Sequence, residues 1–276
     1  MNAIKISSDP AEDAAFHGYA CWRRGTVLFM RAPLRLFMLA VLAQSAILLP
    51  DWLPALVGGR VGGVAALALS AGGLWLEALC YAMLIHLLDA MAGGNQANWR
   101  QAMGAALYLA VAGILYTLAV AVGLALFLLP AVFLSIALLF FAWPIVLEGS
   151  GPLAALEQSW RWTLPRFGRV SAAISIAFLV YGAYSVLSWW PSIAGVAWQP
   201  LATLLAGVRS GATGPLTAAL QAQQIIVPGA VAAPIWYYVV NPLLGGLVMP
   251  PVLGALYEVY RRLREIQPEP SASAAS

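Results

Sequence analysis

An acidic residue inside an apolar stretch is the first candidate for chemistry in this chain. Glu77 lies near the middle of the stretch from Val64 to Leu88. A charge at the centre of a bilayer costs several kcal/mol, so such a residue is seldom kept without a role. Its carboxylate could accept a proton or coordinate a cation. The favoured alternative is a protonated acid hydrogen-bonded to a neighbouring helix, because the sequence offers no second intramembrane charge to pair with it.

Other polar residues near this stretch and in the last apolar segment are weaker candidates. His86 and Asp89 stand three apart, where a metal would need at least one more ligand, so an orienting histidine–aspartate pair at the membrane interface is favoured. Asn241-Pro242 and Pro250-Pro251 interrupt the last segment. Carbonyls freed by these prolines could coordinate an ion or a substrate hydroxyl, although kinks satisfied by neighbouring helices are more common.

Motifs of the major catalytic classes are missing from the sequence. It has no P-loop, no glycine-rich dinucleotide turn, no His-Glu-x-x-His and no Gly-x-Ser-x-Gly, and it holds only 2 histidines. The excess of 14 Lys+Arg over 11 Asp+Glu is too small for a nucleic-acid surface. We therefore expect no enzymatic activity, no cofactor, no metal site and no nucleic-acid partner.

The composition is that of a membrane protein. Hydrophobic residues make up 62% of the chain and charged residues 9%, with a mean hydropathy of +0.83, so lipid must cover most of the surface. An apolar helix of about 20 residues crosses the hydrocarbon core. This length predicts an all-α polytopic protein with six transmembrane helices, over Leu34–Leu49, Val64–Leu88, Met103–Leu128, Ala131–Leu147, Val170–Trp189 and Ile235–Tyr257.

Basic residues are distributed very unevenly about these spans. If the N-terminus is cytoplasmic, all of the 14 Lys+Arg residues except Arg60 and Arg209 fall on the cytoplasmic side. This bias follows the positive-inside rule. It predicts a multi-pass protein of the bacterial inner membrane with both termini in the cytoplasm.

Aromatic and basic residues mark the predicted cytoplasmic ends of the spans. The segment from Pro152 predicts an amphipathic helix along the membrane surface, with Leu153, Leu156 and Trp160 on one face and a Glu157–Arg161 pair on the other. A similar pattern near the N-terminus predicts a second cytoplasmic interfacial helix. The expected interfacial anchors are Trp22, Arg23, Trp160, Arg161, Arg166, Arg169, Tyr257, Arg261 and Arg264.

The remaining segments complete the predicted domain organisation. Residues 16–266 form one membrane domain, and the tails 1–15 and 267–276 are expected to be disordered. The outer stretch from Trp190 to Pro234 predicts an interfacial helix with its tryptophans in the headgroup belt, in preference to a re-entrant loop lining a substrate path.

Two short motifs resemble those of a known family. They are Pro144-Ile-Val-Leu-Glu148-Gly, followed by Ala-Leu-x-x-Ser159-Trp160-Arg161, and a terminal Leu-Tyr257-x-x-x-Arg261-x-x-Arg264. Over residues 20–265 the chain resembles the YciC-like bacterial inner-membrane proteins, which are related to the glycerophosphoryl diester phosphodiesterase membrane domain. The resemblance implies six helical spans without a catalytic domain.

These patterns together predict a membrane-embedded accessory, organising or lipid-interacting domain. Its expected partners are membrane lipids, together with other membrane proteins or a second copy of the chain. The alternative is a small transporter or permease that uses Glu77, a broken sixth span and the tryptophan-rich outer segment. A polar cavity at mid-membrane, shared by Glu77 with Asn241 or a tyrosine, would favour transport.

Overall fold

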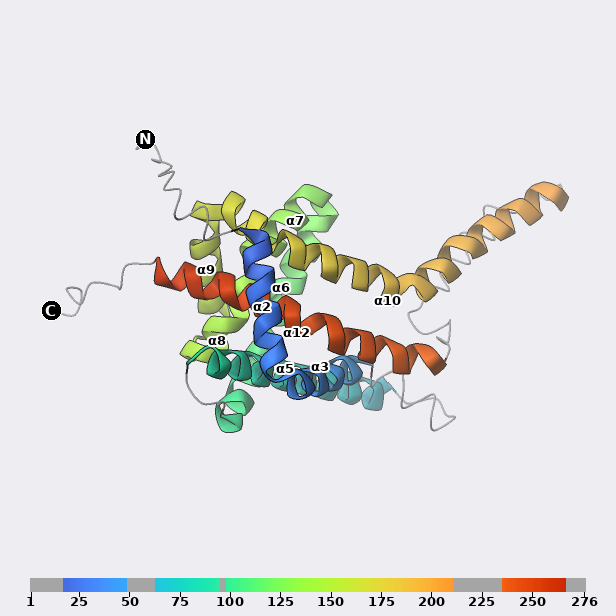
Figure 1. The fold of residues 1–276 in the computed structure, drawn as a ribbon. Coiled ribbons are helices and arrows are strands. Elements are labelled where there is room, and N and C mark those ends of the chain that lie inside the picture. The colour runs from blue at the N-terminus through green and yellow to red at the C-terminus, as the bar shows by residue number, and fades with distance from the viewer. Residues whose placement is uncertain (1–16, 49–62, 95–97, 211–234, 267–276) are drawn as a thin grey trace, which may run out of the picture.

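The computed structural model describes residues 17–48, 63–94, 98–210 and 235–266, and these residues form helices without any strand. Figure 1 shows the helices gathered around α12, drawn in red. In chain order they are α2 (Gly18–Arg31), α3 (Pro33–Ile47), α5 (Gly63–Met91), α6 (Trp99–Leu126), α7 (Leu128–Ala137), the 3-10 turn η1 (Leu139–Phe141), α8 (Ala142–Glu148), α9 (Pro152–Thr163), the 3-10 turn η2 (Leu164–Arg166), α10 (Phe167–Ser210) and α12 (Ile235–Glu265).

The predicted fold class is confirmed. Five helical segments of the described chain are long and apolar enough to cross a membrane, and the bent pair α2–α3 raises the number to six if it counts as one span. The five are Leu67–Met91, Trp99–Leu126, Leu128–Glu148, Pro152–Ser188 and Val239–Glu265. Each predicted span therefore has a counterpart, and the tails predicted to be disordered lie outside the described residues.

A sharp bend comes directly before the first predicted span. Helices α2 and α3 are inclined by 100°, and Ala32 between them has φ −145° and ψ 58°. Proline disfavours the helical conformation of the residue before it, so Pro33 ends α2 and starts α3 at the same point. Helix α3 has 15 residues, or about 22 Å, which is shorter than the hydrocarbon core of about 30 Å.

The fourth predicted span, Ala131–Leu147, is not one helix as expected. It divides into α7, η1 and α8. The division puts Pro144 in the first turn of α8, where its missing N–H leaves no hydrogen bond unmade. The Ser159 hydroxyl of α9 stabilises the break between α7 and α8. It donates to the Ala137 carbonyl at 3.0 Å and accepts from the Phe140 N–H at 3.0 Å.

The sixth span is a continuous helix. The transporter alternative invokes a broken sixth helix, but α12 runs without interruption through Pro242, Pro250 and Pro251. Each proline removes one intrahelical hydrogen bond without ending the helix. Burial explains the difference, because every residue from Met249 to Tyr260 is buried and packing against neighbours holds the helix in place.

Helix α10 is longer than the predicted fifth span. It continues past Trp189 to Ser210, and its 44 residues have a length along the helix of about 66 Å, more than twice the hydrocarbon thickness. The helix predicted from Trp190 is therefore present as far as Ser210, but it continues α10 and is not a separate element. The rest of that stretch, and the environment of its tryptophans, lie outside what the structure describes.

A crossing between α2 and α12 brings two backbones into contact (Figure 1). A Cβ atom placed on Gly254 would lie 2.7 Å from the Gly25 carbonyl oxygen, and one placed on Gly25 would lie 2.6 Å from the Gly254 carbonyl carbon. Close approach of this kind requires small residues on both helices. The glycine pair therefore fixes where α2 crosses α12.

We expect Gly25→Ala to lower the free energy of unfolding by about 2 kcal/mol, because the added methyl group meets backbone atoms and the helices must separate. The matched control is Gly72→Ala, since a Cβ there meets no atom within 4 Å. Thermal unfolding of the purified protein in detergent would measure both. Equal melting temperatures for the two variants would contradict the assigned crossing.

Candidate functional site

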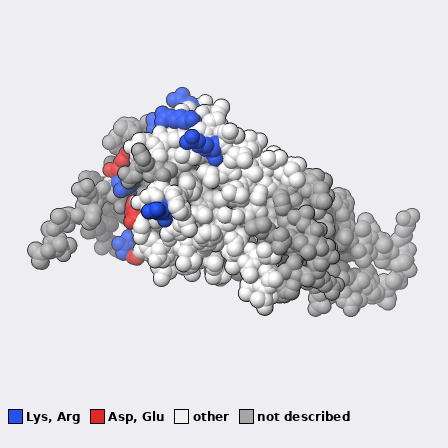
Figure 2. Space-filling view, turned by 90° about the horizontal axis from the view of Figure 1, so that it is seen from below, with Lys and Arg blue, Asp and Glu red and all other residues white. Residues whose placement is uncertain are grey.

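Charged side chains gather at one end of the molecule. Figure 2 shows arginine and acidic residues at the end that holds the C-terminal part of α12, while the middle of the body carries none on this face. Glu77 lies away from this end, at the middle of α5. The charged end is the most polar region that the structure describes, and we treat it as the candidate site.

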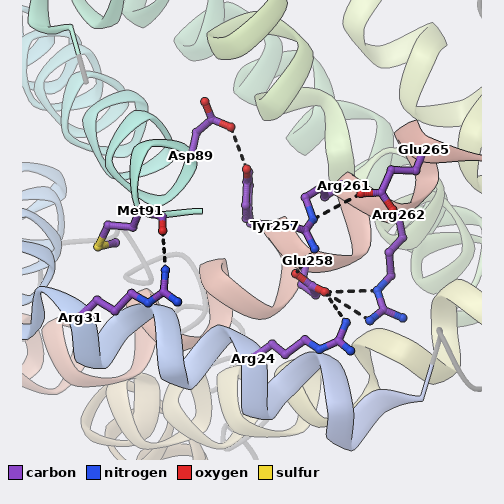
Figure 3. A network of polar contacts seen from close by, with 9 residues as sticks. All are labelled: Arg24, Arg31, Asp89, Met91, Tyr257, Glu258, Arg261, Arg262 and Glu265. Carbon is purple, nitrogen blue, oxygen red and sulfur yellow. Dashed lines mark hydrogen bonds and ion pairs between the residues drawn. The ribbon is translucent and has the colours of Figure 1, made fainter. Parts of the chain in front are cut away.

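Glu258 of α12 is the centre of the charged end (Figure 3). It is only 4% exposed, and its carboxylate lies 2.7 Å from Arg24 of α2 and 3.2 Å from Arg262 of its own helix. Arg261 lies 3.6 Å from the second carboxylate oxygen. Arg262 is itself buried, so the two opposite charges compensate each other away from water.

Two further contacts attach the end of α5 to this centre. The Tyr257 hydroxyl donates to the Asp89 carboxylate at 2.7 Å, and Arg31 of α2 donates to the Met91 carbonyl at 2.6 Å (Figure 3). Tyr257 is only 3% exposed. The sequence predicts this ring at the level of the lipid headgroups, but it lies inside the protein because its hydroxyl has a carboxylate partner there.

Glu148 at the end of α8 is the centre of a second group of polar contacts. Its carboxylate accepts hydrogen bonds from the Tyr260 hydroxyl at 2.8 Å and from Gln158 at 3.0 Å, and Arg264 lies 3.6 Å away. The Tyr260 ring stacks on Trp143 with centroids 5.9 Å apart. The C-terminal end of α12 therefore contacts two acidic side chains of other helices, Asp89 and Glu148.

The predicted anchors occupy several environments. Arg23, Arg161 and Arg264 are exposed, whereas Arg166, Arg169, Arg261, Trp22 and Trp160 are half-buried. The predicted Glu157–Arg161 pair is present. Helix α9 packs against the protein through the buried residues Ala155, Ser159, Trp162 and Thr163, whereas Leu153 of the predicted membrane-facing side is exposed.

A cavity of about 520 Å³ opens beside these contacts, between α5, α6, α8 and α12. His86, Asp89, Glu148 and Arg264 provide its charged and ionisable lining. The structure brings His86 and Asp89 to one cavity, but no hydrogen bond joins them in the described part of the chain. The described residues also contain no group of three His, Cys, Asp or Glu side chains able to hold a metal ion.

A separate polar network lies among the spans. Gln44 of α3 donates to the Tyr81 hydroxyl of α5 at 3.0 Å, and the Tyr184 hydroxyl of α10 lies 3.1 Å from both the Gln44 and the Asn241 side-chain oxygens. Glu77 is half-buried and close enough to Tyr81 to interact with it electrostatically. The predicted residue Asn241 is thus connected by hydrogen bonds to Tyr184, Gln44 and Tyr81, and Glu77 lies one helical turn before Tyr81 on α5.

Some of the missed residues left a signal in the sequence. Glu258 and Arg262 are four apart on a predicted helix, which is the favourable spacing for an ion pair. Glu148 lies inside one of the two motifs quoted above, but its partners come from distant segments. Arg24, Gln44 and Tyr184 gave no signal beyond their polarity.

Comparison of the chain with family models, with curated proteins and with solved structures found no match. The resemblance to the YciC-like proteins therefore stays a prediction. Conclusions about function rest on the geometry of the charged end, the cavity and the network among the spans.

Replacing Glu258 tests the centre of the charged end. We expect Glu258→Gln to lower the free energy of unfolding by about 3 kcal/mol, because Arg262 would stay buried without a countercharge. The matched control is Glu265→Gln on the same helix, whose side chain is 63% exposed and lies 3.6 Å from Arg261. Chemical unfolding in detergent would measure both. A control that loses as much stability as Glu258→Gln would rule out a central role for this carboxylate.

Proposed function

We propose that this integral membrane protein is a lipid-interacting organising domain without catalytic activity of its own. Its charged end faces the cytoplasm and attracts anionic lipid headgroups. The observation that carries the proposal is the combination, in one molecule, of exposed arginines at one end and exposed apolar side chains along the helices. Membrane lipids are accordingly its main partners, and other membrane proteins or a second copy remain further partners within the same role.

The helix surfaces support contact with lipid tails. Along α6, Leu107, Ile114, Leu118 and Val122 are all exposed. A stripe of this kind is unfavourable in water and is matched by hydrocarbon. The apolar surface therefore supports a bilayer position for the body of the molecule.

The geometry of α2 supports a headgroup position for the charged end. Helix α2 turns by 100° away from α3, so if α3 follows the membrane normal, α2 lies along the membrane surface. Arg23 and Arg35 are exposed on either side of this bend. Each arginine near an anionic leaflet contributes about 1 kcal/mol of attraction.

Removing exposed positive charge tests the proposal. We expect the triple variant Arg23→Gln, Arg35→Gln, Arg161→Gln to lose preference for anionic over zwitterionic lipid, by roughly fivefold for each residue that contacts the leaflet. The matched control replaces the same three residues by lysine, which keeps the charge. Relative association of spin-labelled lipids with the reconstituted protein would measure the preference. If the glutamine variant keeps the preference of the parent, the proposal fails.

A small transporter is the second candidate, and the network among the spans favours it. Tyr81, Gln44, Tyr184 and Asn241 come from four different helices, and Glu77 lies beside Tyr81. Chains of hydroxyl, amide and carboxyl groups in spans are typical of proton and cation pathways. In this function Glu77 would bind the proton or cation within the membrane.

Glu77 variants separate the two candidates. Glu77→Gln should fold and insert normally, since glutamine keeps a neutral hydrogen-bonding group of nearly the same shape, whereas Glu77→Lys should not accumulate. For a transporter, Glu77→Gln should also abolish proton or cation flux into proteoliposomes, read by a pH-sensitive dye or a labelled cation. If vesicles with the parent protein, vesicles with Glu77→Gln and protein-free vesicles show equal flux, the transporter function is ruled out.

A further inference from the structure

The cavity at the charged end contains a buried polar atom that lacks a partner. His86 is 4% exposed, and its Nε2 atom makes no hydrogen bond to any described residue. Each nitrogen of a neutral imidazole either donates or accepts a hydrogen bond, and leaving one buried and unsatisfied costs about 1–3 kcal/mol. Because His86 lines the cavity, a molecule bound there could satisfy Nε2.

The charges around the cavity favour a ligand with an ammonium group. Asp89 and Glu148 supply two carboxylates, and Arg264 supplies the one guanidinium of the lining. Glu148 accepts hydrogen bonds from Tyr260 and Gln158 and lies 3.6 Å from Arg264, and Asp89 accepts one from Tyr257. With two carboxylates against one guanidinium, the lining attracts a primary ammonium group, which can share these carboxylate oxygens with the donors already present.

Arg264 adds a second requirement to the ligand. Its side chain is 61% exposed and lies 3.6 Å from Glu148, so the guanidinium is accessible beside the carboxylates. Guanidinium groups bind phosphate through charge-assisted hydrogen bonds. Ammonium and phosphate on the same molecule would match the arrangement of Glu148 and Arg264.

The α6 wall of the cavity indicates where the rest of the ligand lies. Gly104 and Tyr108 line the cavity, and next to them Leu107 is exposed on the apolar outer surface of α6. A headgroup in the cavity could therefore continue into acyl chains along this helix. The volume of about 520 Å³ lies within the range of about 300–1,000 Å³ typical of small-molecule sites.

We propose that this cavity binds the phosphoethanolamine headgroup of an aminophospholipid. The ammonium group lies between Asp89, Glu148 and His86 Nε2, and the phosphate lies at Arg264. This inference deepens the lipid-interacting role proposed above and rests on it. It adds a specific site for a zwitterionic headgroup to a general attraction for anionic lipid.

The chain has only 2 histidines, so hydrogen bonding at His86 can be measured directly by NMR. His17 is exposed, and its side chain makes no capping hydrogen bond at the start of α2, so His17→Gln leaves His86 as the one imidazole of a full-length protein. In this variant, the ¹⁵N chemical shift of Nε2 reports hydrogen bonding at His86 alone. Titration with short-chain phosphatidylethanolamine should shift this resonance saturably.

Three comparison ligands define the specificity. Phosphatidylcholine of the same chain length lacks N–H donors and phosphatidylglycerol lacks the cation, so both should bind at least roughly tenfold more weakly. Free phosphoethanolamine separates a lipid from a soluble source of the same chemistry. Binding of the free compound as tight as that of the lipid would overturn the lipid assignment, and an equal response to phosphatidylglycerol would overturn the ammonium assignment.

Two substitutions on α6 locate the signal. Gly104 lines the cavity and a Cβ there meets no atom within 4 Å, so Gly104→Leu should fill the cavity without disturbing the fold and abolish the titration. Gly113→Leu is the matched control, equally open at its Cβ but outside the cavity lining. Arg264→Gln should weaken binding by roughly tenfold through loss of the phosphate contact.

The outcomes separate this site from the general lipid preference. Loss of the titration in Gly104→Leu, with anionic lipid preference and melting temperature kept, supports the site. A full titration in Gly104→Leu, or none in the parent while anionic preference persists, overturns the site and leaves the proposed function standing. Loss of anionic preference in the parent itself would instead remove the proposed function.

Discussion

The crossing of α2 over α12 is the contact on which the charged end depends. Backbone approach at Gly25 and Gly254 puts Arg24 within 2.7 Å of Glu258, one helical turn further along α12. Without this approach, Glu258 would keep partners from its own helix only, and α2 would lose its ion pair to the core. Two residues without side chains thus position the strongest interhelical charge pair that the structure describes.

The same crossing explains why Tyr257, Tyr260 and Arg262 near the end of α12 are buried. A helix that simply leaves a bilayer would expose its tyrosines and arginines to headgroups and water. Here α2, α5 and α8 supply Arg24, Asp89 and Glu148 as partners, so the Glu258 carboxylate and the Tyr257 and Tyr260 hydroxyls are buried with a partner. Burial of paired groups fixes geometry more than it adds stability, because desolvation offsets much of the attraction. This rigidity suits a site that must hold a headgroup in one orientation.

The spans could be predicted from sequence, but their packing could not. Spans follow from length and hydropathy, since every backbone polar group in the bilayer must be satisfied within a helix. Helix packing cannot be predicted in this way, because lipid tails are as apolar as leucine side chains. An apolar residue in a span therefore does not indicate whether it faces the protein or the lipid. On α9, for example, Leu153 is exposed, whereas Ala155 and Ser159 are buried. Small residues were the available signal, and Pro144 was the signal for the break in the fourth span.

The two polar regions of the molecule are separated along α5. Glu77 and Tyr81 belong to the network among the spans, and His86 and Asp89 belong to the cavity. Between them, α5 buries Ala82, Leu84 and Ile85 almost completely. An ion moving from one region to the other would have to part these close-packed side chains. The packing in this conformation therefore favours two local binding functions over one continuous pathway, and transport would require a second conformation in which α5 separates from its neighbours.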